Sequence, residues 1–325
     1  MSELGKDIII SVIMGVILPG VLLNCAVAVL EDDMNLSVMA VGETADVFEL
    51  SAQDDIPMRL RYADGTVEER NLEEYLVGVV LAEMPAAFEE EALKAQAIVA
   101  RTYTRKSYLT GGKHGDGSTC TSSSCCQAYI SESAYLDSGG TLENIEKIRK
   151  CIESTSGMLL TYAGDLIEAT YFSCSGGSTE DAVAVWGTDF PYLRTVSSPG
   201  EENATYYTDT VRYTKEQLET KTGISLTGNS AGWFSNISYT SGGGVEWITI
   251  GEQNFTGTEM RSLLNLRSTA FTIIPEENAV TILTRGYGHR VGMSQYGADA
   301  MAANGSDFRD ILAHYYPGTE IETIS

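Results

Sequence analysis

The sequence predicts an α+β fold, in which mixed helices and strands form a substrate groove and a transmembrane helix precedes them. Three observations support this class: apolar helical segments near residue 80, strand-like alternation in the middle of the chain, and a long uncharged N-terminal segment. The 325 residues provide for about two domains. We predict a membrane anchor (residues 1–30), followed by a tether with the first strands (31–60) and a main core (61–200). An inserted smaller α+β subdomain (201–270) and a C-terminal part of the core (271–325) complete the chain.

The N-terminal segment predicts a single-pass membrane anchor. Residues 8–30 carry no charged side chain, and a run of this length spans a bilayer core of ~30 Å. The run is longer than the apolar region of a typical signal peptide, which is the competing interpretation. Lys6 precedes it and residues 31–33 are acidic, which favours a main body outside the cytoplasm. Cys25 follows Asn24. A lipoprotein signal has a small residue just before its cysteine, so lipidation is not expected.

The elements of the main core follow from the apolar pattern. Alternation over residues 47–62 predicts strands. Residues 72–84 are apolar on most sides, and Pro85 disfavours helix at the residue before it, so a buried helix should end close to Glu83. A second helix is predicted over residues 89–109.

The remaining chain alternates loops, helices and strands. Predicted loops cover residues 110–126 and 173–179. Predicted helices cover residues 143–153, 215–222, 259–266 and 294–304, with a last helix before residue 315. Predicted strands are a pair over 158–172 that turns at 163–165, a pair at 233–239 and 245–251, and one strand from residue 279.

The charge excludes one class of partner. Asp and Glu total 45 against 21 Lys and Arg, for a net charge of −24. Such a surface repels a polyanion, so nucleic acid is not expected as a partner. Hydrophobic residues at 43% and only 7 prolines indicate a folded protein instead of a largely disordered one.

Glu83 is the first candidate for chemistry. Its apolar neighbours Val80, Leu81 and Met84 and the negative end of the helix dipole both disfavour a carboxylate, so its pKa should be raised. A glutamic acid of raised pKa is the proton donor that glycosidic bond cleavage needs. The alternative is a solvated glutamate at a helix end.

A glycine- and serine-rich loop carries a candidate metal site. Three potential ligands are evenly spaced as H-x5-C-x5-C: His114, Cys120 and Cys126. Imidazole and thiolate are favoured zinc ligands, and three protein ligands with an open position are typical of a catalytic site. A disulfide is the competing interpretation, with Cys151 and Cys174 also available. The fourth zinc ligand is open between water, Cys125 and Cys174.

Residues 285–298 predict a glycine-rich turn between a strand and a helix. Such a turn directs backbone N–H groups at a ligand oxygen. The spacing is GxGxxxG, and no second strand of a βαβ unit follows, which argues against a dinucleotide site.

Together these segments resemble the SpoIID/LytB family of sporulation and amidase-enhancer proteins, from about residue 60 to the C-terminus. The segments that carry the resemblance are residues 79–86, 95–103, 126–129, 175–177, 185–187, 192–194, 286–298 and 314–318. The resemblance implies a membrane-anchored lytic transglycosylase, a lyase of peptidoglycan glycan strands that acts during engulfment. It also implies that the substrate strands have been stripped of their stem peptides by a SpoIIP-like amidase, and that a SpoIIM-like protein is the membrane partner.

The resemblance assigns the catalytic glutamate to Glu83 and zinc ligation to His114, Cys120 and Cys126. Other members lack these cysteines, so the metal could chiefly order its loop. Arg290 replaces the small residue of the family's turn. The candidates for substrate contacts are Arg101, Tyr103, Tyr171, Ser175, His289, Ser294, Gln295 and Tyr296, and those for stacking on sugars are Trp186, Tyr192 and Trp233.

Three other reactions or roles stay open. A glycoside hydrolase needs a second carboxylate, for which Glu89, Asp116, Glu180 and Asp181 are candidates. A non-catalytic module that binds peptidoglycan and stimulates a partner amidase would tolerate Glu83→Gln. A zinc amidase would release peptides and leave the glycan intact.

Overall fold

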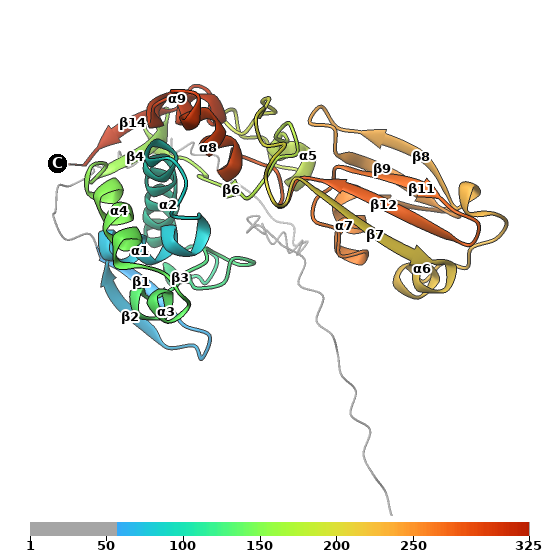
Figure 1. Ribbon diagram of the computed structural model, residues 1–325, viewed down its shortest axis with the longest axis horizontal. Helices are drawn as coiled ribbons and strands as arrows, with labels where there is room; N and C mark the ends of the chain where they lie inside the picture. The colour runs from blue at the N-terminus through green and yellow to red at the C-terminus, as the bar shows by residue number, and fades with distance from the viewer. Residues whose placement is uncertain (1–56, 325) are drawn as a thin grey trace, which may run out of the picture. The chain divides into compact units, whose positions relative to one another are not determined.

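The computed structural model describes residues 57–324, in which helices and strands alternate along the chain (Figure 1). This confirms a mixed fold of helices and strands, built around two hydrophobic cores. The predicted anchor and nearly all of the predicted tether lie outside the described residues. Within residues 57–324, no helix is long and apolar enough to cross a membrane. The substrate groove stays a prediction.

Helix α2 (Glu90–Thr110) is the central element of the first core. Its four alanines, Ala92, Ala95, Ala97 and Ala100, are fully buried, and their small side chains let neighbouring helices approach closely. The helix ends at Gly111, whose φ of 85° suits glycine. Four helices pack against it: α1 (Leu72–Glu83), α4 (Leu142–Glu153), α8 (Gln295–Ala303) and α9 (Phe308–Tyr315).

Helix α1 places Glu83 at its end. The Asn71 side chain caps the first turn by accepting hydrogen bonds from Glu73 N and Glu74 N. The helix interior is almost entirely buried. Met84 is extended, as expected for a residue before proline, and this ends the helix at Glu83 as predicted.

Short strands complete the first core. They form three small sheets, ordered β2-β1-β3, β14-β4-β5 and β13-β6. Their bounds are β1 (Pro57–Arg61), β2 (Val67–Asn71), β3 (Ser118–Cys120), β4 (Met158–Tyr162), β5 (Asp165–Leu166), β6 (Tyr171–Phe172), β13 (Met293–Ser294) and β14 (Glu320–Thr323). Two short helices were not predicted: α3 (Glu132–Asp137) and α5 (Ala182–Trp186).

The second core belongs to the inserted region. It has two three-stranded sheets, ordered β11-β12-β7 and β10-β9-β8. The elements are β7 (Thr208–Thr214), α6 (Lys215–Thr222), η1 (Ser230–Gly232), β8 (Phe234–Tyr239), β9 (Val245–Ile250), β10 (Gln253–Thr256), α7 (Gly257–Leu263), β11 (Phe271–Pro275) and β12 (Ala279–Arg285).

The inserted region is longer than predicted. Its predicted end is residue 270, but Phe271, Val280 and Ile282 are buried in the second core. The reason is strand pairing, because β12 is hydrogen-bonded along its whole length to β7 and also pairs with β11. The return to the first core therefore comes at the glycine turn after β12.

Candidate active site and metal cluster

Glu83 is held by groups from three separate parts of the first core. Its Oε1 accepts a hydrogen bond from the backbone N of Ala128 at 2.7 Å and lies 3.3 Å from the hydroxyl of Tyr171. Its Oε2 lies 3.4 Å from Nε2 of Gln295, which donates to it. The structure thus brings together three predicted site residues, Glu83, Tyr171 and Gln295, and adds the backbone of Ala128.

The environment of Glu83 favours the protonated acid. Burial raises the pKa of its carboxyl above the ordinary value, and the hydrogen bonds from Ala128, Gln295 and Tyr171 offset this only in part. The raised pKa of Glu83 agrees with the expectation from the sequence. A carboxyl group that keeps its proton above the usual pH range can act as a general acid.

The hydrogen bonds around Tyr171 are compatible with a proton on Glu83. The Gln127 amide nitrogen donates to Thr104 Oγ1 and to the Tyr75 hydroxyl, so its oxygen faces Tyr171 at 3.0 Å. A tyrosine hydroxyl has one proton to donate, and the shorter distance is to Gln127. The Tyr171 oxygen can then accept a hydrogen bond from the protonated carboxyl of Glu83. Gln127 was missed as a site residue, although it lies inside a segment that carries the family resemblance.

A two-residue parallel strand pair positions Tyr171 and Gln295. The register of β6 and β13 sets Met293 opposite Tyr171, and Ser294 opposite Phe172. Helix α8 begins directly after β13, so its first residue is Gln295. Residues from both sides of the inserted region therefore meet at one carboxyl group.

Gly292 allows this strand pair to form. Its φ is 84°, and a Cβ at this position would lie 2.0 Å from the carbonyl oxygen of Thr170. Any side chain would collide with that backbone. The glycine-rich turn therefore provides close packing between two segments of the site.

His289 supports the Tyr171 segment. Its Nδ1 accepts a hydrogen bond from Val291 N at 3.1 Å, and the ring also hydrogen bonds to the Tyr171 backbone. The ring packs against Phe172 and Trp186, with centroids 5.6 and 5.2 Å apart. These contacts suit a positioning residue.

His289 is neutral at ordinary pH. Burial, together with the positive charges of Arg261 and Lys113, lowers the pKa of His289 to about 3. A neutral imidazole with both nitrogens engaged holds the local backbone and is not available for proton transfer.

Ser175 and Ser294 bind a buried carboxylate that the sequence reasoning missed, that of Glu201. Glu201 is 1% exposed. Its oxygens accept hydrogen bonds from the Cys174 thiol, the backbone N of Ser175 and Gly176, and the hydroxyls of Ser175, Ser198 and Ser294. Because Ser175 and Ser294 are buried and engaged, they position the loop and the start of α8. This differs from the predicted substrate contacts.

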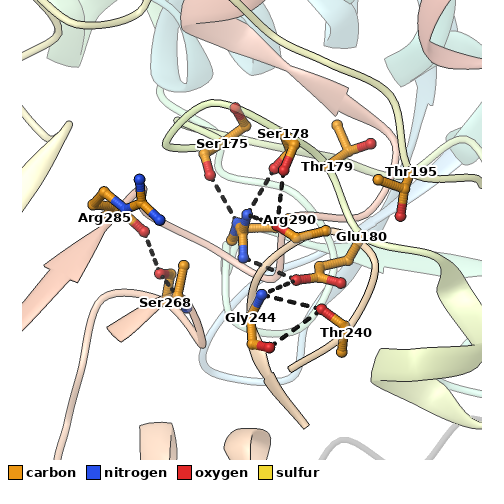
Figure 2. Close-up of polar contacts among 12 residues, drawn as sticks. Ser175, Ser178, Thr179, Glu180, Thr195, Thr240, Gly244, Ser268, Arg285 and Arg290 are labelled. Carbon is orange, nitrogen blue, oxygen red and sulfur yellow. Dashed lines mark hydrogen bonds and ion pairs between the residues drawn. The ribbon is translucent and has the colours of Figure 1, made fainter. Parts of the chain in front are cut away.

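Arg290 is a buried connector between the two cores (Figure 2). Its Nη1 lies 2.9 Å from Glu180 Oε1, and Nε donates to the Ser175 carbonyl at 2.7 Å. Its Nη2 donates to the carbonyls of Ser178 and Gly242 at 2.8 and 2.7 Å. The side chain therefore joins the loop after β6 to the turn between β8 and β9, which explains an arginine at this position.

The four acidic residues considered as a second carboxylate do not join Glu83. Among residues 57–324, none of them hydrogen bonds to Glu83 or to its partners. Asp116 pairs with Arg61, Asp181 accepts from Thr195 N and Ser241 Oγ, Glu180 pairs with Arg290, and Glu89 is exposed just before α2. The two-carboxylate hydrolase therefore has no support among these candidates.

Arg101 is a structural residue, which corrects the predicted substrate contact. Its side chain is fully buried and forms two hydrogen bonds to Glu73, at 2.6 and 2.7 Å. It also contacts the carbonyls of Ile152 and Met158. All three guanidinium nitrogens of Arg101 already donate hydrogen bonds within the protein, so none is free to bind a ligand.

The aromatic candidates have different positions. Tyr103 hydrogen bonds to the Cys126 thiol and so belongs with the cysteine loop. Tyr296 packs edge-on against Phe88, with centroids 5.0 Å apart. Trp233 and Tyr192 are 2% and 6% exposed, which leaves little surface for stacking on a sugar. Trp186 is half-buried beside His289.

The cysteine loop gathers four potential metal ligands. One ligand atom from each of His114, Cys120, Cys125 and Cys126 lies within 4.8 Å of the others. Sγ of Cys126 is 3.5 Å from His114 Nε2, and the Sγ atoms of Cys125 and Cys126 are 3.8 Å apart. Tetrahedral zinc with Zn–S bonds of about 2.3 Å requires S to S separations near ~3.8 Å. The residues present therefore fit zinc.

The competing disulfide has no support. All five described cysteines are free, and Cys151 and Cys174 are buried away from the loop ligands. The Cys174 thiol contacts Glu201 instead, so of the protein candidates for the fourth ligand only Cys125 lies in the cluster.

The fold and site define a mixed α/β protein built around one acid-favouring glutamate and a His/Cys cluster. The SpoIID family, described as "Stage II sporulation protein", matches residues 63–162. The chain is 39% identical over 266 residues to "Stage II sporulation protein D" of Bacillus subtilis, and 37% identical to the protein of that name from Bacillus amyloliquefaciens. Both matches cover 80% of this chain and 77% of the relative. The chain belongs to the SpoIID family of stage II sporulation proteins, which confirms the predicted family.

A further relative is the "Amidase enhancer" of Bacillus subtilis, at 30% identity over 303 residues. That match covers 76% of this chain but 40% of the relative. The similarity therefore reaches only part of the longer protein.

Proposed function

We propose that this protein is a lytic transglycosylase that cleaves the bond between N-acetylmuramic acid and N-acetylglucosamine in peptide-stripped peptidoglycan during sporulation. The observation that carries the proposal is Glu83, a half-buried carboxyl whose surroundings favour its protonated form. Membership of a sporulation family is consistent with this role.

One carboxyl group can complete this reaction. Protonated Glu83 donates its proton to the glycosidic oxygen as the C1–O bond breaks. The C6 hydroxyl of the same muramic acid residue attacks C1, and the Glu83 carboxylate takes the hydroxyl proton. The products are a free 4-hydroxyl on one sugar and a 1,6-anhydro ring on the other. No water is consumed, and Glu83 ends protonated.

The partners of Glu83 have distinct roles in this scheme. The Ala128 N–H and Gln295 hold the carboxyl oxygens and stabilise the carboxylate formed midway. In the resting state the Tyr171 hydroxyl accepts a hydrogen bond from the protonated Glu83 carboxyl, and afterwards it donates a hydrogen bond to the carboxylate. Partial burial disfavours the ionised form of Glu83, so the carboxylate depends on these hydrogen bonds.

We also propose that zinc is bound by His114, Cys120, Cys125 and Cys126. Bound zinc would serve as a Lewis acid or as a structural cross-link, and four protein ligands favour the cross-link because they leave no open position. Residues 126–128 join this loop directly to the Glu83 contact, so an ordered loop would hold Ala128 N in place.

Localisation and partners extend the proposal. The uncharged residues 8–30 would anchor the protein in the cell membrane, with the described residues outside the cytoplasm. A SpoIIP-like amidase would supply stripped strands, and a SpoIIM-like protein would be the membrane partner.

Mass spectrometry of glycan products tests the reaction. The full chain in detergent is incubated with peptide-free glycan strands, beside Glu83→Gln and the matched control Glu74→Gln from the same helix. We expect 1,6-anhydro-muramic ends from wild type and Glu74→Gln, and at least a ~100-fold lower yield from Glu83→Gln. Reducing-end products would contradict the transglycosylase and indicate hydrolysis.

A second candidate is a binding module that stimulates a partner amidase, which the similarity to an amidase enhancer favours. It predicts no anhydro ends and a Glu83→Gln variant that stimulates as well as wild type. Release of peptides by the chain alone, with intact glycan, would instead indicate a zinc amidase.

A further inference from the structure

Among residues 57–324, the guanidinium of Arg261 has no acidic partner, although the chain is strongly acidic. The sequence has 45 acidic residues against 21 Lys and Arg. Arg261 lies on α7 and is partly buried, which makes its charge costly. Its Nε donates to the carbonyl of Arg267 at 3.2 Å. Among residues 57–324 its Nη atoms have neither an ion pair nor a hydrogen bond, so they can bind an anion.

The position of Arg261 connects it to the active site. The Arg267 carbonyl that it contacts also accepts a hydrogen bond from Gly288 N at 3.0 Å. The next residue, His289, hydrogen bonds to the backbone of Tyr171 and lies within the electrostatic influence of Arg261. The Tyr171 hydroxyl is in turn 3.3 Å from Glu83. The second core therefore presents a free cation beside the turn that supports the catalytic group.

Two exposed aromatic rings contact Arg267, the residue whose carbonyl Arg261 binds. Tyr206 and Tyr287 are 39% and 42% exposed, with their rings edge to face at 5.3 Å. Arg267 lies over both rings, 5.1 and 5.6 Å from their centroids, but Asp209 pairs with it at 3.2 Å. Tyrosine rings can contact the faces of sugars. Arg261 contacts the backbone of this Arg267 and, among residues 57–324, has no acidic partner of its own.

We propose that Arg261 binds the carboxylate of a sugar acid in the glycan strand, beside Tyr206 and Tyr287, and thereby selects strands with free carboxylates. The inference rests on the proposed function. Muramic acid carries a lactyl carboxylate that becomes an uncharged amide when a peptide is attached. A guanidinium distinguishes the two, because charge-assisted hydrogen bonds to a carboxylate are stronger than those to an amide.

A binding measurement tests this assignment without depending on cleavage. The full chain carrying Glu83→Gln is titrated with peptide-free glycan strands, and with the same strands after chemical reduction of their carboxylates to alcohols. We expect Arg261→Gln to weaken binding of carboxylated strands about tenfold and to leave binding of reduced strands unchanged. The matched control is Arg309→Gln on α9, a second arginine without an ion pair among the described residues, which should change neither.

Arg261→Lys separates charge from packing. It keeps the positive charge but loses the Nε contact to Arg267, so it should retain most of the preference for carboxylated strands. Equal weakening for both kinds of strand, or no weakening with Arg261→Gln, would overturn the assignment. Arg261-dependent binding with no anhydro products would refute the proposed reaction only, whereas cleavage without the Arg261 preference would refute this inference only.

Discussion

Gln295 donates from Nε2 to Oε2 of Glu83 across 3.4 Å, although 212 residues separate them in the chain. The inserted second core lies between them in sequence. The contact depends on the β6 to β13 pairing, which returns the chain to the first core next to Tyr171. The candidate active site is therefore assembled only when both parts of the first core have joined.

Replacing Gln295 should change both the rate and its pH dependence. The hydrogen bond from Gln295 lowers the pKa of Glu83 by stabilising its carboxylate. Gln295→Met removes that bond, so the Glu83 pKa should rise and the alkaline decline of the rate should move to higher pH. We expect the rate to fall about tenfold. A pH profile of anhydro-product formation measures this, and an unchanged or downward-shifted decline would refute it.

Glu83 should make stability depend on pH. Its pKa is raised in the folded protein, so its stabilising contribution is complete below the unfolded value of about 4.3 and is lost as pH rises through the folded pKa. Glu83→Gln has no such loss. The melting temperature of the variant relative to wild type should increase from pH 4 to pH 8. A difference that stays constant would show that Glu83 is solvated.

Removal of Arg290 should destabilise the protein strongly. Arg290→Ala would leave Glu180 buried without its cation, which costs about 3–5 kcal/mol. Arg290→Ala combined with Glu180→Gln should recover part of that loss, because no unpaired charge remains. Denaturant unfolding measures both, and purely additive losses would contradict the pair.

Metal content should depend on four residues. Native mass spectrometry of the full chain should find one zinc ion, and Cys125→Ser should lower zinc affinity as much as Cys126→Ser. Cys151→Ser is the control, since Cys151 is buried away from the cluster. Retention of zinc by Cys125→Ser with unchanged affinity would indicate three protein ligands. Chelation should lower the melting temperature.

Local patterns predicted much of the first core. Helix α1 ends at Glu83 because Pro85 acts on its immediate neighbour, and the turn at 163–165 appears between β4 and β5 as expected. The cysteine spacing predicted three potential metal ligands in one loop, and the structure places Cys125, one of the candidates for the fourth, beside them. Such features depend on residues close in sequence, whose preferences can be read directly.

Other predictions went wrong where burial decides a residue's role. Arg101 and Ser175 had the right chemistry for substrate contacts, but they are fully buried and paired with Glu73 and Glu201. Glu201 follows a Ser-Pro-Gly turn and looks like a surface residue in the sequence. A hydrogen-bond donor can serve either a ligand or a distant carboxylate, and residue type does not distinguish these.

Family, helix ends, the acid candidate and the cysteine loop were all readable in the amino-acid order, because each depends on motifs or on short-range backbone preferences. The hydrogen bonds that join Tyr171 and Gln295 to Glu83, the burial of Glu201 and the connection made by Arg290 were not. These arise when segments far apart in the chain exclude water from the same polar groups, which must then pair with one another.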